Sequence, residues 1–256
     1  MSGLLFGMGD VDYSGPLAEA YDRGRRLPPA TTRIWIEAAR RHLPTGSDPV
    51  LDLGAGTGRF LRALGEGLGA PIVGLEPAAG MRALAMEHIG PAISLVGGTA
   101  SKLPFASDVF RGVWASQVLH HVTDLEGCAL ELRRVIKQGG RVLVRGMYEA
   151  LPTQWPLVRY FPGVVSVHER FFSSLEQMRI ALLCSGFSEL AHECIEQVVA
   201  EDAESFYERT AQRADSGLVL LSDSDFKAGL ATLRHEIDHG RCIGPISEIL
   251  DLVVFG

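Results

Sequence analysis

The sequence has few cysteines, and they lie far apart. Its 256 residues include four, Cys128, Cys184, Cys194 and Cys242, with no Cys-x-x-Cys pair among them. A disulfide framework or a cysteine-based zinc site needs paired, closely spaced cysteines. We therefore expect four small buried hydrophobic side chains in a reducing compartment, the cytoplasm, and no metal site.

Long apolar runs and basic clusters are also missing. No apolar run approaches the roughly 18 residues that a membrane-spanning helix needs, and the first ten residues lack the length and charge of a signal peptide. Acidic residues outnumber basic ones, 31 to 24, and Lys and Arg never occur more than two in a row. Nucleic-acid binders generally need a basic patch that displaces counterions. Neither a membrane nor a nucleic acid is therefore an expected partner.

What the chain does have is a regular alternation of predicted strands and helices. Apolar residues at helical spacing predict helices within residues 16–42, interrupted at Pro28 and Pro29. The predicted strands that follow are 49–53, 71–75, 93–97, 109–115, 141–145, 187–198 and 248–255. The predicted helices between them are 58–68, 78–88, 124–137, 173–185, 201–213 and 223–237. Alternation over 48–145 is typical of parallel strands with right-handed crossovers, which bind ligands at the carboxyl ends of the strands.

The most informative segment is residues 50–60, an apolar strand with one acid, followed by three glycines spaced two apart. Gly54, Gly56 and Gly58 allow a sharp turn and a close approach of the backbone to a ligand. Asp52 stands before the turn, where a buried carboxylate is unfavourable without a cationic or hydrogen-bonding partner. An amine on a cofactor would provide that partner.

Two other known ligand-binding motifs with glycine-rich turns, the nicotinamide fingerprint and the P-loop, match residues 50–60 less well. The nicotinamide fingerprint Gly-x-Gly-x-x-Gly would need a third glycine at position 59, which is Arg59. No Gly-Lys-Ser/Thr follows, which excludes a P-loop. The second predicted strand ends in Glu76, an acid placed where recognition of ribose hydroxyls needs one. A nicotinamide oxidoreductase is therefore a remote alternative.

With these motifs the chain resembles the class I S-adenosylmethionine-dependent methyltransferases, in their small-molecule (methyltransferase type 11-like) branch. The resemblance covers residues 10–150 with specific motifs and the remainder by general layout. Its blocks are 52–58, Glu76-Pro77 with Met81, 98–105, 113–121 and 134–144. The resemblance implies S-adenosylmethionine as the cofactor and a Rossmann-like α/β fold, a seven-stranded methyltransferase sheet with helices on both faces and lid insertions.

The resemblance also implies a set of cofactor-binding residues. Glu76 would bind the ribose diol, Met81 would pack on adenine, and Arg25 would pair with the methionyl carboxylate unless it is only a solvated helix charge. The full set is Tyr21, Arg25, Asp52, Gly54, Ala55, Gly56, Gly58, Glu76, Pro77, Met81, Thr99, Ala100, Ser116 and Gln117. Thr99 departs from the usual Asp, so the side-chain bond to the adenine amine is weaker or is replaced by a backbone one.

The sequence does not single out one residue as the general base that removes a proton from the acceptor. His120 and His121 follow the fourth strand, where the methyl group is expected, and His168 is a rival for the role of general base. His121 would otherwise cap the next helix. The aromatic residues Tyr148, Trp155, Tyr160 and Phe171 form either a substrate lid or ordinary core.

We therefore predict a methyltransferase for a small molecule, with a role in secondary metabolism. The expected parts of its single domain are a helical cap (1–45), a cofactor-binding core (46–145), and the last two strands with lid helices (146–256). A methyltransferase for RNA or protein, and a catalytically silent cofactor-binding partner protein, stay open as alternatives. The acceptor atom, the substrate and the oligomeric state are not predicted.

Overall fold

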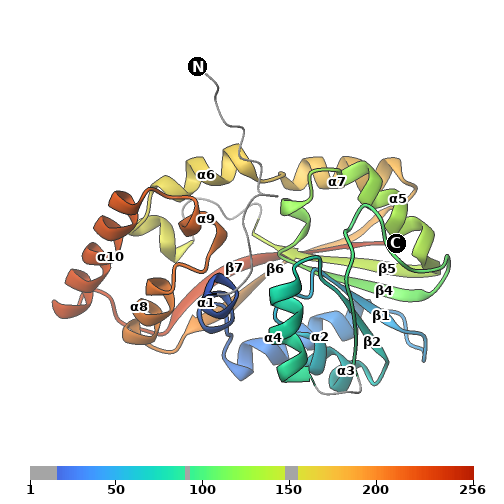
Figure 1. Ribbon diagram of the computed structural model, residues 1–256, viewed down its shortest axis with the longest axis horizontal. Helices are drawn as coiled ribbons and strands as arrows, with labels where there is room; N and C mark the ends of the chain where they lie inside the picture. Colours follow the sequence, from blue (N-terminus) through green and yellow to red (C-terminus); the bar gives the residue numbers. More distant parts are fainter. Residues whose placement is uncertain (1–15, 90–92, 148–154) are drawn as a thin grey trace.

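A seven-stranded sheet runs through the protein, in the order β3-β2-β1-β4-β5-β7-β6 (Figure 1). We describe a computed structural model that covers residues 16–89, 93–147 and 155–256. The strands are β1 (Val50–Leu53), β2 (Ile72–Leu75), β3 (Ser94–Val96), β4 (Phe110–Ser116), β5 (Ile136–Gly146), β6 (Glu189–Ala200) and β7 (Ile246–Phe255). The first five strands pair in parallel, and β7 is antiparallel to both of its neighbours. The chain order reverses between β1 and β4, which is where such sheets bind ligands.

Helices cover both faces of the sheet, as predicted. On one face α2 (Pro29–His42) and α3 (Leu61–Leu68) share a core with β1 and β4, and on the other α5 (Leu125–Val135) and α7 (Leu175–Cys184) do so. The remaining helices are α1 (Pro16–Gly24), α4 (Ala79–Ile89), α6 (Gly163–Phe171), α8 (Ala203–Ala211), α9 (Ser216–Val219) and α10 (Asp223–Asp238), with short 3-10 turns η2 (Leu119–His121) and η3 (Pro156–Arg159).

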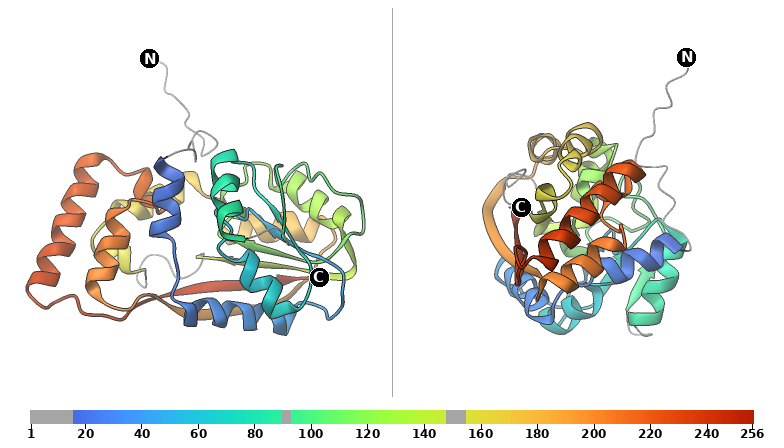
Figure 2. Two further views of the ribbon diagram at one scale, coloured as in Figure 1. Left: turned by 60° about the horizontal axis from the view of Figure 1, so that its bottom comes forward. Right: turned by 90° about the vertical axis from the view of Figure 1, so that its left-hand side faces the viewer.

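Helices far apart in the sequence gather at one end of the sheet. Figures 1 and 2 show α6, α8, α9 and α10 together at that end, with α1 between this group and the rest of the molecule. Contacts of α1 with α8 on one side and α4 on the other agree with this placement. The N-terminal helix therefore links the C-terminal helices to the half of the sheet that carries the glycine turn.

The predicted strands are all present, and the errors concern short helices and the ends of elements, including β5, which was predicted to begin at 141 and begins at Ile136. The predicted helix 124–137 ends at Val135, because Ile136 already pairs with Phe110 in the sheet. The turns η2 and η3 and the helices α6 and α9 were not predicted, since each is short or lies in an aromatic-rich stretch without clear periodicity.

A buried arginine ties the central strands together beneath the site. Arg145 in β5 is 1% exposed and stacks on Trp35 of α2, with its guanidinium carbon 4.4 Å from the ring centroid. Arg145 donates to Ser116 Oγ (3.0 Å) and to Gln197 Oε1 (2.6 Å), and the latter oxygen also accepts from Trp35 Nε1. Burial lowers the pKa of Arg145 well below its usual value. These contacts hold the side chain of Ser116 at the end of β4.

The expectation that all four cysteines are buried is confirmed for only two of them. Cys128 and Cys242 are buried as expected, whereas Cys184 and Cys194 are exposed, so the expectation was wrong for these two. Cys184 is the last residue of α7, and Cys194 lies on β6, the edge strand of the sheet, so both side chains reach the surface.

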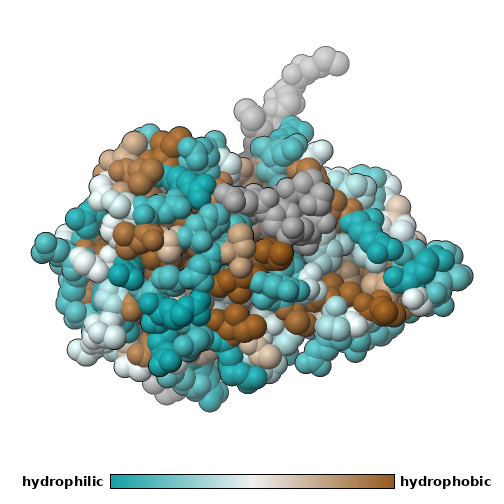
Figure 3. Space-filling model, turned by 180° about the vertical axis from the view of Figure 1, so that it is seen from behind, coloured by the Kyte–Doolittle hydropathy of each residue, from teal (hydrophilic) through white to brown (hydrophobic). Residues whose placement is uncertain are grey.

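The surface mixes apolar and hydrophilic side chains. Seen from behind, brown patches alternate with teal ones over the described part of this face (Figure 3). Within the described residues, no helix combines the length and apolar composition needed to cross a bilayer.

Among the described glycines, Gly54 combines a left-handed backbone conformation with a neighbouring side chain closer than 3 Å to a built Cβ. Its φ is +69°, and a Cβ built on it would lie 2.3 Å from Val118 Cγ2. We expect Gly54→Ala to lower the free energy of unfolding by roughly 2–4 kcal/mol, because steric overlap adds to an unfavourable backbone conformation. Urea denaturation measures this difference. Gly69→Ala is the matched control, since its φ is +57° but a Cβ there would meet nothing within 4 Å. Equal losses in the two variants would contradict the packing argument.

Candidate functional site

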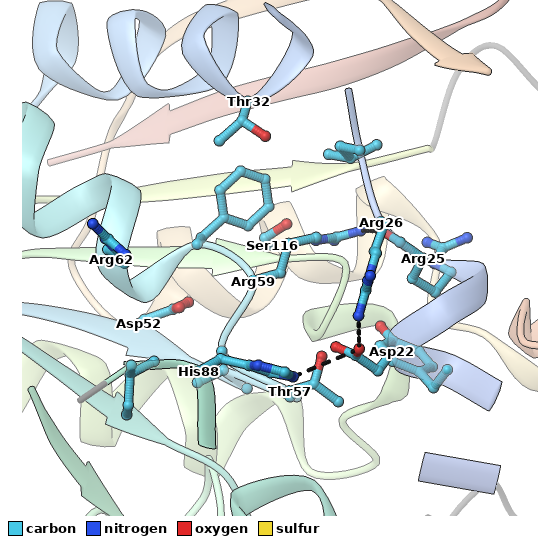
Figure 4. Close-up of a pocket in the computed structure, with 18 residues that line it drawn as sticks. Asp22, Arg25, Arg26, Thr32, Asp52, Thr57, Arg59, Arg62, His88 and Ser116 are labelled. Carbon is cyan, nitrogen blue, oxygen red and sulfur yellow. Dashed lines mark hydrogen bonds and ion pairs between the residues drawn. The ribbon is translucent and has the colours of Figure 1, made fainter. Parts of the chain in front are cut away.

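A cavity of about 490 Å³ opens at the carboxyl ends of β1 and β4 (Figure 4). Eight of the predicted cofactor residues line it: Tyr21, Arg25, Asp52, Gly54, Ala55, Gly56, Gly58 and Ser116. They come from α1, β1, the glycine turn and the end of β4. The structure thus brings together residues that are separated by almost 100 positions in the sequence, at the place where the topology predicts a ligand.

Glu76 closes the glycine turn from the neighbouring strand. Its Oε2 accepts a hydrogen bond from the backbone N–H of Gly56 (3.0 Å), and its Oε1 accepts one from Ala78 (2.9 Å). Burial raises the pKa of Glu76, and these two backbone donors oppose the shift. Each carboxylate oxygen keeps a further lone pair. Glu76 can therefore hold the turn and accept hydrogen bonds from a pair of hydroxyls at once.

Asp52 is a buried carboxylate that faces the cavity. It is 2% exposed, and no hydrogen-bond donor is found for it among the described residues. Burial raises the pKa of Asp52 to about 8, partly offset by the charge of Arg59 and reinforced by that of Glu76. A site of this kind favours a ligand that brings its own cation or hydrogen-bond donor.

Arg59 is a cavity residue that the sequence analysis did not assign to the site. Its Nη1 donates to the backbone oxygen of Arg25 (2.6 Å), and its guanidinium lies over Phe60. Burial lowers the pKa of Arg59 to about 10, so the side chain is still cationic at neutral pH. Figure 4 shows it between Asp52 and Arg26. Cation and carboxylate thus line the same cavity, which suits a zwitterionic group such as an α-amino acid.

A second unpredicted group surrounds Asp22 at the cavity mouth. Its carboxylate accepts from Arg26 Nη2 (2.8 Å) and lies 3.6 Å from His88 Nε2 (Figure 4). Hydrogen bonds from Arg26 and Thr57 lower the pKa of Asp22, although burial, the largest single effect, acts in the opposite direction. Only the i, i+4 spacing of Asp22 and Arg26 is a sequence signal for this group. It joins α1 to the glycine turn and to α4.

Arg25 is held by two partners. Its Nη1 lies 2.5 Å from Asp215 Oδ2, and its Nη2 donates to Gln117 Oε1. Burial lowers the pKa of Arg25, but the charges of Asp215 and Tyr21 outweigh this and leave it above its usual value. Gln117 has φ +53°, a strained conformation for a residue other than glycine, at the exit of β4. The solvated-charge interpretation of Arg25 was wrong, because its side chain is mostly buried.

The three candidate histidines share one small compartment beside the main cavity. This space of about 30 Å³ is lined by Tyr21, Arg25, Gln117, His120, His121, Met147, Trp155, His168, Asp215, Ser216 and Glu248. The ring of Phe172 lies within 4.4–5.2 Å of all three imidazole rings, centroid to centroid. Burial lowers the pKa of His120 and of His168, and it lowers the pKa of His121 to about 4. All three imidazoles are therefore neutral near pH 7, which a general base requires.

The other six predicted residues are not in the lining of this cavity: Gln117 lines the histidine compartment, and Glu76 contacts the glycine turn through Gly56. Met81 is buried, Pro77 and Thr99 are exposed, and Ala100 packs against the main core. Thr99 also forms an isolated bridge with Lys102.

Of the predicted lid, Trp155 and Tyr160 belong to the buried core of the C-terminal helices, and Phe171 packs against that core. Tyr148 lies outside the described residues. Trp155 also lines the histidine compartment, so it is the aromatic residue of the predicted lid that reaches the site.

One group of potential metal ligands lies elsewhere, where His192, Cys194 and Asp251 bring their ligand atoms within 4.8 Å of one another. His192 Nδ1 lies 3.2 Å from Arg179 Nη2, and its Nε2 lies 2.8 Å from Asp251 Oδ1. Because a guanidinium can only donate, Nδ1 must accept and Nε2 carries the proton toward Asp251. A metal would have to displace that proton, so this arrangement is better satisfied without one.

Comparisons with known proteins agree with this geometry. The family described as "Methyltransferase domain" matches residues 51–144. Demethylmenaquinone methyltransferase of Mycobacterium marinum is 39% identical over 113 residues, which are 44% of this chain and 47% of that protein. The chain thus spans about half the length of this curated relative.

Solved structures share the fold over most of the chain. A protein of Anabaena variabilis, described as a methyltransferase from an antibiotic biosynthesis pathway, has a TM-score of 0.66 at 21% identity, covering 90% of this chain and 98% of its own. Phosphoethanolamine N-methyltransferase 2 of Haemonchus contortus, in complex with S-adenosyl-L-methionine, has a TM-score of 0.63 at 17% identity, covering 97% and 58%. Residues 51–144 thus match a methyltransferase domain, and the chain shares its fold with solved methyltransferases; these findings support a class I S-adenosylmethionine-dependent methyltransferase with S-adenosylmethionine as its cofactor.

Proposed function

We propose that the protein transfers the methyl group of S-adenosylmethionine to a small-molecule acceptor. The observation that carries this proposal is the buried carboxylate of Asp52 in the lining of the cavity, beside a glycine turn whose Gly56 N–H donates to Glu76 from the neighbouring strand. In this assignment Glu76 accepts the ribose hydroxyls, and the carboxylate of Asp52 meets the ammonium of the methionyl group. Arg59 and Arg25 lie at the same cavity and would bind the methionyl carboxylate.

The reacting atom of the acceptor would lie next to the histidine compartment. Methyl transfer from a sulfonium needs alignment and exclusion of water more than it needs activation, and alignment alone lowers a barrier by roughly 7–11 kcal/mol in model systems. A base is needed only for an acceptor that arrives protonated. The three neutral histidines next to the cofactor cavity suit such an acceptor, with oxygen, nitrogen or acidic carbon as the reacting atom.

A small acceptor is favoured over RNA or protein for two reasons. The compartment is lined by imidazole, aromatic and acidic side chains, among them Asp215 and Glu248, and the net charge of the chain is −7. Both features oppose entry of a polyanionic substrate. The relative from Mycobacterium marinum is named for a small-molecule substrate, which supports the same class. A cytoplasmic role in secondary metabolism is part of this proposal.

Calorimetry tests the cofactor and radiolabel transfer tests the acceptor class. We expect micromolar binding of S-adenosylhomocysteine and none of NADH. With tritium-labelled S-adenosylmethionine and a cell extract, we expect label in organic-extractable small molecules. Label in RNA or protein would contradict the acceptor class, whereas binding without any transfer would favour a catalytically silent protein.

A further inference from the structure

Asp215 lies where the cofactor cavity and the histidine compartment meet. It precedes α9, and its Oδ1 caps that helix by accepting from the backbone N–H of Gly217 (2.9 Å). Its Oδ2 accepts from Arg25 Nη1 at 2.5 Å. Arg25 lines both spaces, while Asp215 lines the histidine compartment. The ion pair therefore forms part of the wall between the cofactor and the acceptor.

The same turn contacts two of the histidines. Ser216 Oγ lies 3.4 Å from His121 Nε2. Gly217 also lies close to His168. A Cβ built on Gly217 would be 3.4 Å from His168 Nε2 and 3.3 Å from Asp215 Oδ1. His121 Nδ1 is buried and has no hydrogen-bond partner among the described residues. One nitrogen of His121 is thus oriented by the turn, and the other is available for a proton.

Opposite charges act on His121 from two elements. Apart from burial, which is the largest effect, Asp215 raises the pKa of His121, whereas Arg25 and His168 lower it. His120 stacks beside it, with ring centroids 4.0 Å apart. While Arg25 and Asp215 neutralise each other, the remaining carboxylate of the compartment is Glu248, whose Oε1 accepts a hydrogen bond from Gln197 Nε2 (2.5 Å).

We propose that Asp215 is a positioning residue that couples cofactor binding to proton removal by His121. The proposal rests on the proposed function. When the methionyl carboxylate binds Arg25, it replaces Asp215 as the partner of the guanidinium. Asp215 is then free to stabilise the protonated form of His121, whose orientation Ser216 fixes. His121 becomes an effective base only when the methyl donor is in place.

The reaction balances as follows. The acceptor's O–H or N–H proton moves to Nδ1 of His121, and the acceptor atom forms a bond to the methyl carbon. The bond between sulfur and that carbon breaks, and its electron pair stays on sulfur, giving the neutral thioether S-adenosylhomocysteine. His121 returns the proton to solvent after product release, when Asp215 pairs with Arg25 again.

The test measures histidine pKa values by NMR on the full chain, with His121→Gln identifying the signal. We expect saturating S-adenosylhomocysteine to raise the pKa of His121 by at least one unit. 5′-Methylthioadenosine, which lacks the amino-acid group, should bind without this rise. In Asp215→Asn, which retains the helix cap, the rise should be lost, and Asp215→Glu should restore part of it.

A binding measurement separates coupling from a merely structural role. Because Asp215 competes with the methionyl carboxylate for Arg25, Asp215→Asn should bind S-adenosylhomocysteine several-fold more tightly, with 5′-methylthioadenosine unchanged. Asp223→Asn, which removes an exposed partner of Arg213, is the matched control and should change neither quantity. Binding with an unchanged His121 pKa, or weaker binding by Asp215→Asn, overturns the coupling alone. No binding of S-adenosylhomocysteine to the wild type overturns the proposed function and this inference together.

Discussion

Replacing Glu76 by Ala should weaken S-adenosylhomocysteine binding by about 100-fold or more. In the proposed function the change removes the acceptor of two ribose hydroxyls, and it also removes the hydrogen bond that holds Gly56. Hydrogen bonds to a charged group contribute roughly 1.5–3 kcal/mol each, and a tenfold change in affinity corresponds to about 1.4 kcal/mol. Isothermal titration calorimetry measures the difference. Glu66→Ala is the matched control, because Glu66 is an exposed acid of α3 that pairs with Arg62 outside this contact.

The role of Glu76 in ribose recognition can be separated from its role in holding the turn. A ligand without the 2′-hydroxyl should lose affinity for the wild type but not for Glu76→Ala, because the partner of the missing hydroxyl is already gone. If the loss were the same in both proteins, Glu76 would only hold the turn. Equal affinity of Glu76→Ala and wild type for S-adenosylhomocysteine itself would remove the ribose assignment.

The cofactor half of the site was predictable because its residues are local in sequence. The glycine turn and Asp52 are contiguous, and Glu76 ends the adjacent strand, so a short pattern and the parallel topology place them together. The parallel pairing of the first five strands was predicted from the alternation of strands and helices. These features depend on backbone geometry, to which glycines, apolar runs and turn residues respond directly.

The acceptor side was predictable only in part, since its residues come from distant segments. His120, His121 and His168 were named as rivals, and the structure shows that they share one compartment. Asp215 and Ser216 carry no motif, and their place depends on how α9 packs against the end of β4. Arg59 was used only to exclude a nicotinamide site, although it lines the cavity. Side chains that meet through tertiary packing leave no periodic signal.

Asp52 illustrates how a binding site opposes stability, and Asp52→Asn should raise stability while it weakens binding. Burial raises the pKa of Asp52 to about 8, against 3.8 for the unperturbed group. Between these pH values the unfolded chain releases a proton that the folded protein retains, so the free energy of unfolding of the wild type falls as pH rises from 4 to 8. Asparagine has no such dependence. At pH 8.5 we expect the variant to be more stable by roughly 2–5 kcal/mol.

Urea denaturation at pH 5.5, 7 and 8.5 should therefore show an advantage of Asp52→Asn that grows with pH and levels off above 8. S-Adenosylhomocysteine affinity should move the other way. The wild type should bind more tightly as pH rises toward 8, because the ammonium needs the ionised carboxylate, while the variant should bind at least tenfold more weakly at pH 8.

A variant that is less stable at pH 8.5 would show that a protein donor satisfies Asp52. Unchanged affinity would show that the ammonium binds elsewhere. Opposite changes in stability and affinity would instead show that the buried carboxyl group of Asp52 lowers the free energy of unfolding and serves to bind the cofactor.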